Sequence, residues 1–139
     1  MDLLRRESDY ALRCLAHLAR RGTGYLGSVH RIAIEEKIPE PLLRKTLGKL
    51  KRAGVVKSVR GSLGGFRISL PPEKTTVLKV VEAVQGPMRI SRCFVAKDWC
   101  PCQPKCRLRP KLMRVQEGLE KLLYDMTTRR RPAAQDRFR

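Results

Sequence analysis

The chain has 139 residues, of which 42% are apolar, and this is enough for one compact domain with a buried core. Its 31 lysines and arginines against 13 aspartates and glutamates give a formal net charge of +18, so the expected partner is a polyanion. The sequence has no apolar run of about 18 residues and opens on charge where a signal peptide would be apolar, so we expect a cytoplasmic protein without membrane association.

The first part of the sequence predicts three helices in a row. Residues 8–21 place apolar side chains on one face, with Ser8 as the candidate cap, and two glycines end the pattern. Ser28 caps a short second helix, and the two prolines of the next turn suit the start of a third helix over residues 40–53. The buried stripe of this third helix consists of Leu43, Leu47 and Leu50.

A basic hairpin is expected directly after the third helix. Gly54 is a stop signal, and the segments VVKSV and FRISL alternate in polarity on either side of the turn RGSLGG. This order of elements is that of a winged helix-turn-helix, in which the second helix of the pair enters the major groove of DNA. The fold class we expect is therefore mainly α with a small β-hairpin wing.

Basic residues cluster on the third helix and on the wing. Residues 44–60 include seven basic side chains and no acidic one, and such a cluster favours a nucleic acid over a merely solvated face because it repels itself and needs counterions. The tip around Arg60 lacks bulk and carries a guanidinium, which suits a narrow minor groove. The candidate DNA-binding residues are Ser28, Glu40, Pro41, Arg44, Lys45, Lys49, Arg52, Ser58, Arg60 and Gly61.

Two more helices are expected beyond the wing. The segment TTVLKVVEAV is rich in β-branched residues, but its apolar spacing favours a helix. A long helix over residues 108–126 follows, with the alternating steps of four and three that form a coiled-coil seam. Since symmetric operators are read by dimers, we favour dimerisation through this helix over packing on its own domain. The seam residues are Leu108, Leu112, Val115, Leu119, Leu122 and Met126.

Four of the five cysteines lie within residues 93–106. Cytosolic thiols are kept reduced and an odd total fits a disulfide framework poorly, so a metal site or a redox sensor is favoured. Structural zinc is an alternative that lacks the usual paired C-x2-C spacing, and an enzyme or electron-transfer module would have no catalytic constellation. A cluster-free, thiol-sensing repressor on the same fold also stays open. Cys14, alone on the first helix, is expected to be buried and inert.

A set of segments carries a family resemblance: SDYALRCLAHLA, IPEPLLRKTLGKLKRAGVV, SVRGSLGGFRISLPPE, VVEAVQGP, and three cysteines just before CRLRPKL. From about residue 5 to residue 127, the chain resembles the IscR, NsrR and RirA family of bacterial winged-helix regulators. The resemblance implies a homodimeric transcription factor that binds operator DNA. It also implies an iron–sulfur cluster whose state changes the affinity for DNA, in response to nitric oxide, redox state or cluster supply.

The resemblance also implies a ligand set. Arg107 stands where IscR-like members have a histidine, so the set is expected to be NsrR-like, with a [4Fe-4S] cluster favoured and a [2Fe-2S] cluster as the alternative. In NsrR-like members an aspartate from the first helix of the other subunit completes the site, although such a residue also complements the dipole of a first helical turn. The implied ligands are Cys93, Cys100, Cys106 and Asp9, with Cys102 as the alternative.

The expected organisation follows these elements along the chain. It consists of a winged helix-turn-helix DNA-binding domain (residues 1–86), a cluster-binding loop (87–107), a dimerisation helix (108–128) and a disordered basic tail (129–139).

Overall fold

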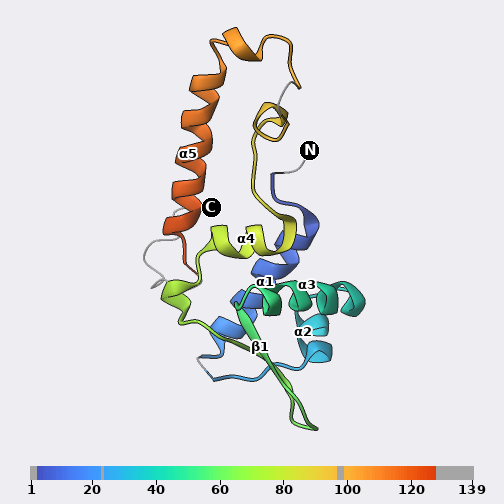
Figure 1. Cartoon of the computed structure of the whole chain (residues 1–139). Coiled ribbons are helices and arrows are strands. Elements are labelled where there is room, and N and C mark those ends of the chain that lie inside the picture. The colour runs from blue at the N-terminus through green and yellow to red at the C-terminus, as the bar shows by residue number, and fades with distance from the viewer. Residues whose placement is uncertain (1–2, 23, 97–98, 128–139) are drawn as a thin grey trace.

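The computed structural model describes residues 3–22, 24–96 and 99–127. Within these residues the chain forms five α-helices and one antiparallel hairpin, which confirms a mainly α, winged-helix fold (Figure 1). The basic tail at 129–139 lies outside the described residues. The elements are α1 (Arg6–Arg20), α2 (Val29–Glu35), α3 (Glu40–Arg52), β1 (Val56–Val59), β2 (Gly65–Ile68), α4 (Val77–Gln85) and α5 (Arg109–Asp125), with short 3-10 turns at Pro72–Lys74, Arg92–Phe94 and Gln103–Lys105.

The helix-turn-helix unit is built around one apolar core. Side chains from α1 to α4 and from the start of the hairpin fill it, and Leu15, Leu43 and Leu47 are fully buried. The buried residues of α3 recur three and four positions apart, so one stripe packs on α1 and α4 while the opposite side faces solvent. Figure 1 shows the hairpin extending away from this body, at the end opposite to the loop that precedes α5.

The starts of the first two helices differ in how well they were predicted. Ser28 caps α2 as expected, since its Oγ accepts a hydrogen bond from the backbone N–H of Arg31 at 3.2 Å. The expectation that Ser8 caps α1 is wrong, because the helix begins two residues earlier. The Ser8 hydroxyl is buried and donates to Oε1 of Gln85 at 2.5 Å, so a contact with α4 replaces the cap.

The segment rich in β-branched residues is helical, as its spacing predicted. Thr76 caps α4 by accepting a hydrogen bond from the backbone N–H of Lys79 at 3.2 Å. Val80 and Val84 are buried in the core that α4 shares with α1 and α3, and Val81 is also fully buried. Burial of this stripe outweighs the preference of valine for strands.

The wing is an antiparallel hairpin that is fixed to the body near its base. Its strands β1 and β2 pair along their full lengths. Gly27, in the connection between α1 and α2, exchanges two backbone hydrogen bonds with Phe66 of β2, at 2.9 and 2.8 Å. This third short partner fixes the direction in which the hairpin projects.

The last helix, α5, stands beside the segment 86–96 and extends away from the helix-turn-helix body (Figure 1). Its end is tied to the start of α4, because the carbonyl oxygen of Met126 accepts a hydrogen bond from the backbone N–H of Val77 at 2.8 Å. In α5, all of which is described, Gln116 is the one buried residue. Of the helices in the described residues, none has the length and apolar content that crossing a bilayer requires.

Candidate nucleic-acid interface and cysteine loop

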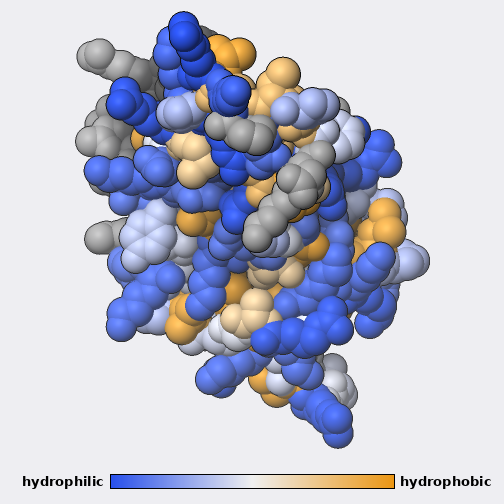
Figure 2. Space-filling model, turned by 45° about the horizontal axis from the view of Figure 1, so that its top comes forward, coloured by the Kyte–Doolittle hydropathy of each residue, from blue (hydrophilic) through white to orange (hydrophobic). Residues whose placement is uncertain are grey.

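The solvent side of α3 carries the basic residues that the sequence assigned to DNA. Arg44, Lys45 and Arg52 are exposed, whereas the leucine stripe of the same helix is buried. Figure 2 shows a molecular face on which hydrophilic residues predominate, with apolar side chains in small groups between them. A row of exposed cations on the second helix of a helix-turn-helix unit can contact phosphates and base edges. Ser28 and Pro41 are exposed at the starts of α2 and α3.

Glu40 organises the charges in the first turn of α3. Its Oε1 accepts a hydrogen bond from Nε of Arg44 at 3.1 Å, and its Oε2 lies 3.1 Å from Nδ1 of His30 on α2. Two hydrogen bonds hold the pKa of the Glu40 carboxyl below its usual range. The bond with His30 has the larger effect on this pKa, and the bond with Arg44 has the next largest. The Arg44 guanidinium is therefore paired and oriented before any phosphate or base competes for it.

Lys49 is placed differently from the other cations of α3. Its Nζ donates to Oε2 of Glu7 on α1 and to the carbonyl oxygen of Val84 on α4, each at 2.8 Å. The expectation that Lys49 points outward with the DNA-binding residues is therefore corrected. Its long side chain reaches across the edge of the core and joins α3 to two other helices, so it is tied up within the protein.

The wing carries three further residues that the sequence singled out. Arg60 is exposed at the end of β1, and Ser58 is half-buried within that strand. Gly61 has a φ of 117°, a backbone conformation that side chains rarely adopt, so it is needed for the turn. These positions place a guanidinium near the outer end of the hairpin.

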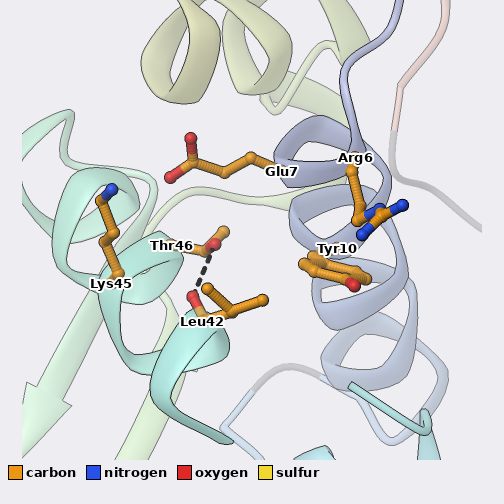
Figure 3. A pocket seen from close by; sticks show the side chains of 6 residues that line it. All are labelled: Arg6, Glu7, Tyr10, Leu42, Lys45 and Thr46. Carbon is orange, nitrogen blue, oxygen red and sulfur yellow. Dashed lines mark hydrogen bonds between the residues drawn. The ribbon is translucent and has the colours of Figure 1, made fainter. Parts of the chain in front are cut away.

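A small cavity of about 200 Å³ lies between α1 and α3. Figure 3 shows Glu7 reaching from α1 toward α3, Lys45 across the cavity from it, and Arg6 next to the ring of Tyr10. The hydroxyl of Thr46 donates to the carbonyl oxygen of Leu42 at 2.9 Å. Arg6 and Lys45 lie at opposite sides of the cavity (Figure 3). Nothing in the sequence singled out Arg6, because only the packing of α1 against α3 brings it to the same cavity as Lys45.

The cysteines occupy two different environments. All five are free thiols; Cys93, Cys100 and Cys106 are half-buried and Cys102 is exposed. Cys14 is fully buried in the core, and this burial raises its pKa from 9.0 to about 12. The prediction that Cys14 is a core residue is confirmed, and the loop that we call the cysteine loop, residues 91–107, holds the accessible thiols.

Arginine–aromatic contacts shape the cysteine loop. The guanidinium of Arg92 lies 5.1 Å from the ring centre of Trp99, and that of Arg109 lies 5.5 Å from the ring centre of Phe94. Arg109 also donates a hydrogen bond to the carbonyl oxygen of Cys93 at 2.7 Å. Trp99 is 53% exposed, so it covers little of its own loop.

Asp9 lies on the exposed side of α1. Its carboxylate is 3.4 Å from the guanidinium of Arg13, one turn along the helix, and its side chain is 58% exposed. Within one subunit it is therefore paired with a neighbour on its own helix. An exposed carboxylate remains available to a second subunit.

Two glutamines that no sequence motif singled out hold the base of the cysteine loop. Gln85 accepts hydrogen bonds from Arg5 and Ser8 at the start of α1. Gln116 of α5 donates to the carbonyl oxygen of Met88 at 2.7 Å and accepts from the backbone N–H of Ile90 at 2.9 Å. Residues 84–90, which we call the junction, are thus bound to α1 and α5, and through Lys49 to α3. A glutamine in sequence gives no signal for such a role.

The donor set of the cysteine loop fits an iron–sulfur cluster in its chemistry. Soft thiolates are the ligands such clusters require, and Cys93, Cys100 and Cys106 lie on one segment. Among the described residues, no three Cys, His, Asp or Glu side chains are gathered closely enough to hold a metal ion. Binding of a cluster would therefore require the described thiols to come closer together.

Comparisons with known proteins place the chain among regulators. The model of the Rrf2 family, described as iron-dependent transcriptional regulators, matches residues 4–129. The transcriptional regulator NsrR of Bacillus subtilis is 34% identical over 103 residues, which are 73% of this chain and 70% of the relative. Among solved structures, CymR, the global cysteine regulator of B. subtilis, has a TM-score of 0.74 at 23% identity, covering 92% of this chain and 94% of that one. IscR of T. potens has a TM-score of 0.71 at 22% identity, covering 89% and 81%. The two structural likenesses show a shared fold.

Proposed function

The chain belongs to the Rrf2 family of transcriptional regulators, and on this premise we propose that it is a cytoplasmic, homodimeric repressor whose cysteine loop senses a signal through an iron–sulfur cluster. It is a DNA-binding regulator rather than an enzyme. We further propose that it works as three parts: the DNA-binding domain (1–86), the cluster-binding loop (87–107) and the dimerisation helix (108–128). The observation that carries the proposal is the junction, which joins the cysteine loop to α1, α3 and α5.

Operator DNA would be bound by α3 and the wing of each subunit. In this proposal the exposed cations Arg44, Lys45 and Arg52 contact the major groove, and Arg60 contacts the minor groove. The remaining candidates, Ser28, Pro41, Ser58 and Gly61, would contact the sugar–phosphate backbone. Glu40 would orient Arg44, since the two are already paired. Lys49 is left out of this interface because it is bound to Glu7 and Val84.

The exposed apolar side of α5 supports a homodimer. Val115 and Leu122 are 58% and 65% exposed in the single chain, and they belong to the predicted seam. A long helix with an uncovered apolar stripe is stable when it packs against a second helix of the same kind. Dimerisation through α5 would place two copies of α3 on two half-sites of a symmetric operator.

Cys93, Cys100 and Cys106 would hold the cluster, and Asp9 of the partner subunit would complete it, with Cys102 as the alternative ligand. When bound, the cluster supplies a redox-active, nitric-oxide-reactive centre, with [4Fe-4S] favoured over [2Fe-2S]. Arg109 would help to hold the start of this loop in place, since it donates a hydrogen bond to the carbonyl oxygen of Cys93. A hard carboxylate among soft ligands binds weakly and exchanges readily, which suits a sensor.

The junction provides a physical route from the cysteine loop to the DNA-binding surface. Lys49 binds the carbonyl oxygen of Val84, at the loop's side of α4, and Gln85 binds the start of α1, which carries Asp9. A change in the loop that moves residues 84–90 would therefore shift α3 relative to α1. This coupling requires that the two states of the loop make different contacts at the junction.

Anaerobic purification followed by DNA titration tests the proposal. We expect a coloured protein with visible absorption, containing iron and sulfide. Its affinity for the operator should differ at least about tenfold from that of the cluster-free protein, a typical size for coupling between two sites. Nitric oxide should move the loaded protein to the cluster-free value. A colourless protein with stoichiometric zinc would instead identify a structural metal site.

Two substitutions test the ligand set. Asp9→Ala should preserve fold and dimer but change the visible spectrum of the cluster and weaken the response of DNA binding to cluster loss. Cys102→Ala should leave both nearly unchanged. The reverse result, with a silent Asp9→Ala and a lost cluster in Cys102→Ala, would assign all four ligands to cysteines.

A cluster-free thiol sensor is the second candidate. The state of the thiols favours it. Cys102 is exposed, the described cysteines are all free, and they are not gathered into a metal site. In that case iron would not change operator affinity, whereas a thiol oxidant would, and Cys102→Ala would abolish the effect. The same titration therefore separates the two candidates.

A further inference from the structure

The outermost residues of the wing are Ser62 and Leu63, at the centre of a turn. The backbone N–H of Gly64 donates to the carbonyl oxygen of Gly61 at 2.9 Å and closes this turn. Leu63 is 90% exposed, more than any other large apolar side chain in the described residues. The expectation that the tip lacks bulk is therefore wrong. Turn positions usually hold polar residues or glycine, and Leu63 contributes almost nothing to the core.

The backbone presents the Leu63 side chain on a rigid support. A Cβ atom on Gly64 would lie 2.4 Å from the carbonyl oxygen of Val59, and one on Gly65 would lie 2.4 Å from that of Gly27. Both glycines are thus required by close backbone approach within the turn and against the body. A preformed hairpin loses little conformational entropy when its tip enters a binding partner.

The hairpin that carries this apolar tip is basic. Lys57, Arg60 and Arg67 are exposed, and residues 56–68 include no acidic side chain. Such a surface repels other basic surfaces, including a second copy of this wing, and attracts the phosphates of DNA. Two paired strands lie about 4.8 Å apart and the minor groove is about 6 Å wide, so a turn rich in glycine can approach the groove. The occupant that fits both charge and shape is the minor groove of DNA.

We propose that Leu63 enters the minor groove as an apolar wedge that partly unstacks a base step and bends the operator. Apolar side chains placed in the minor groove act in this way in other DNA-bending proteins, at a cost of a few kcal/mol per step. Arg60 would contact the neighbouring phosphates or the wall of the groove, while the Leu63 side chain would move from water into the groove. Flexible pyrimidine–purine steps are the sequences that deform most easily, so Leu63 would also impose a sequence preference. The inference rests on the proposed binding of DNA and adds a residue and a mechanism to it.

The test compares Leu63→Ser with Ser62→Ala, its neighbour in the same turn, on the operator that the wild-type protein selects from random duplexes. Leu63→Ser should weaken binding about tenfold to a hundredfold, the value of burying one leucine. The salt dependence should not change, because no phosphate contact is lost, whereas Arg60→Ala should reduce the slope by about one unit. The bend measured by energy transfer between the duplex ends should decrease in Leu63→Ser alone.

A second duplex sharpens the experiment. Replacing the pyrimidine–purine step under the wing by an A-tract should weaken wild-type binding and leave Leu63→Ser binding almost unchanged. Equal affinity and equal bend in Leu63→Ser and wild type would overturn the inference while leaving the proposed function intact. A reduced salt slope in Leu63→Ser, or the same loss in Ser62→Ala, would also overturn it, since the turn as a whole would then be responsible. A wild-type protein that selects no duplex would defeat the proposed function itself.

Discussion

Residues 6–85 and residues 86–127 differ in how they bury their apolar side chains. The first region encloses a continuous core in which Leu15, Ile32 and Leu47 are fully buried. In the described part of the second region, Met88 and Gln116 are the buried residues, while apolar side chains from Val95 to Met126 are largely exposed. A domain that buries its core within one chain can hold its shape alone. An exposed apolar surface of this extent is one that the proposed contact with a second subunit would cover.

The same difference separates the polar contacts. The first region is joined by contacts such as that of Lys49 with Glu7. Contacts in the second include those of Gln116, the ion pair of Arg89 with Glu120, and arginines that lie over aromatic rings. A region with few buried contacts opens at low free energy, and sensing elements are drawn from such regions. In the proposed function, the first region would bind the operator and the second would carry the sensing site.

The largest difference between the regions is expected in thiol reactivity. At pH 8, a pKa of about 12 leaves Cys14 roughly a thousandfold less thiolate than a pKa of 9.0 would. In metal-free protein, iodoacetamide should label the cysteine loop within minutes and leave Cys14 unlabelled until denaturant is added. Mass spectrometry of timed samples measures this. Comparable labelling of Cys14 would mean that the core opens as readily as the loop.

The proposed dimer should depend on the second region. Val115→Asp places an unpaired charge in the proposed seam, and at several kcal/mol per buried charge the dissociation constant should rise by about a thousandfold. Sedimentation should then report monomers with native helical content. Glu117→Lys, on the polar side of α5, is the matched control and should remain a dimer. A dimeric Val115→Asp variant would remove α5 from the interface.

Truncating one apolar side chain in each region should change the free energy of unfolding by different amounts. In the monomeric Val115→Asp background, Leu47→Ala should lower the free energy of unfolding by about 2–5 kcal/mol, because Leu47 is fully buried. Leu122→Ala should change it by less than about 0.5 kcal/mol, since this side chain is 65% exposed. Denaturant titration followed by circular dichroism measures both. A large loss in Leu122→Ala would show that α5 packs on its own chain more than its exposure indicates.

Lys49 gives the smallest and most specific effect. Lys49→Met should cost about 1–2 kcal/mol of stability, because its contacts with Glu7 and Val84 are partly exposed. The salt dependence of DNA binding should stay the same in this variant. Arg52→Ala is the counterpart: stability should hold while the slope falls by about one unit. A lower slope in Lys49→Met would return this residue to the DNA interface.

The sequence predicted much of the first region and less of the second. Apolar periodicity located the five α-helices of the described residues but not the short 3-10 turns, and the alternating segments around RGSLGG located the wing. Prediction from the sequence failed where one side chain had two possible partners. Ser8 has the chemistry of a cap but bonds to Gln85, and Lys49 looks like a phosphate contact but bonds to Glu7 and Val84. Gln85 is 77 positions from Ser8, and Glu7 and Val84 are 42 and 35 positions from Lys49. Local spacing in the sequence therefore gives no sign of these partners.

Sequence alone determined the secondary-structure elements, the basic character of α3 and the wing, and the concentration of thiols in one loop. Each of these depends on residue type and local spacing. Tertiary structure decided which polar groups face the interior. It directed Lys49 inward and kept Arg44 outward, bound the junction with Gln85 and Gln116, and exposed Leu63 at the end of the wing. The reason is that a buried polar group must find a partner and an apolar group must find cover, and both depend on which segments meet in space.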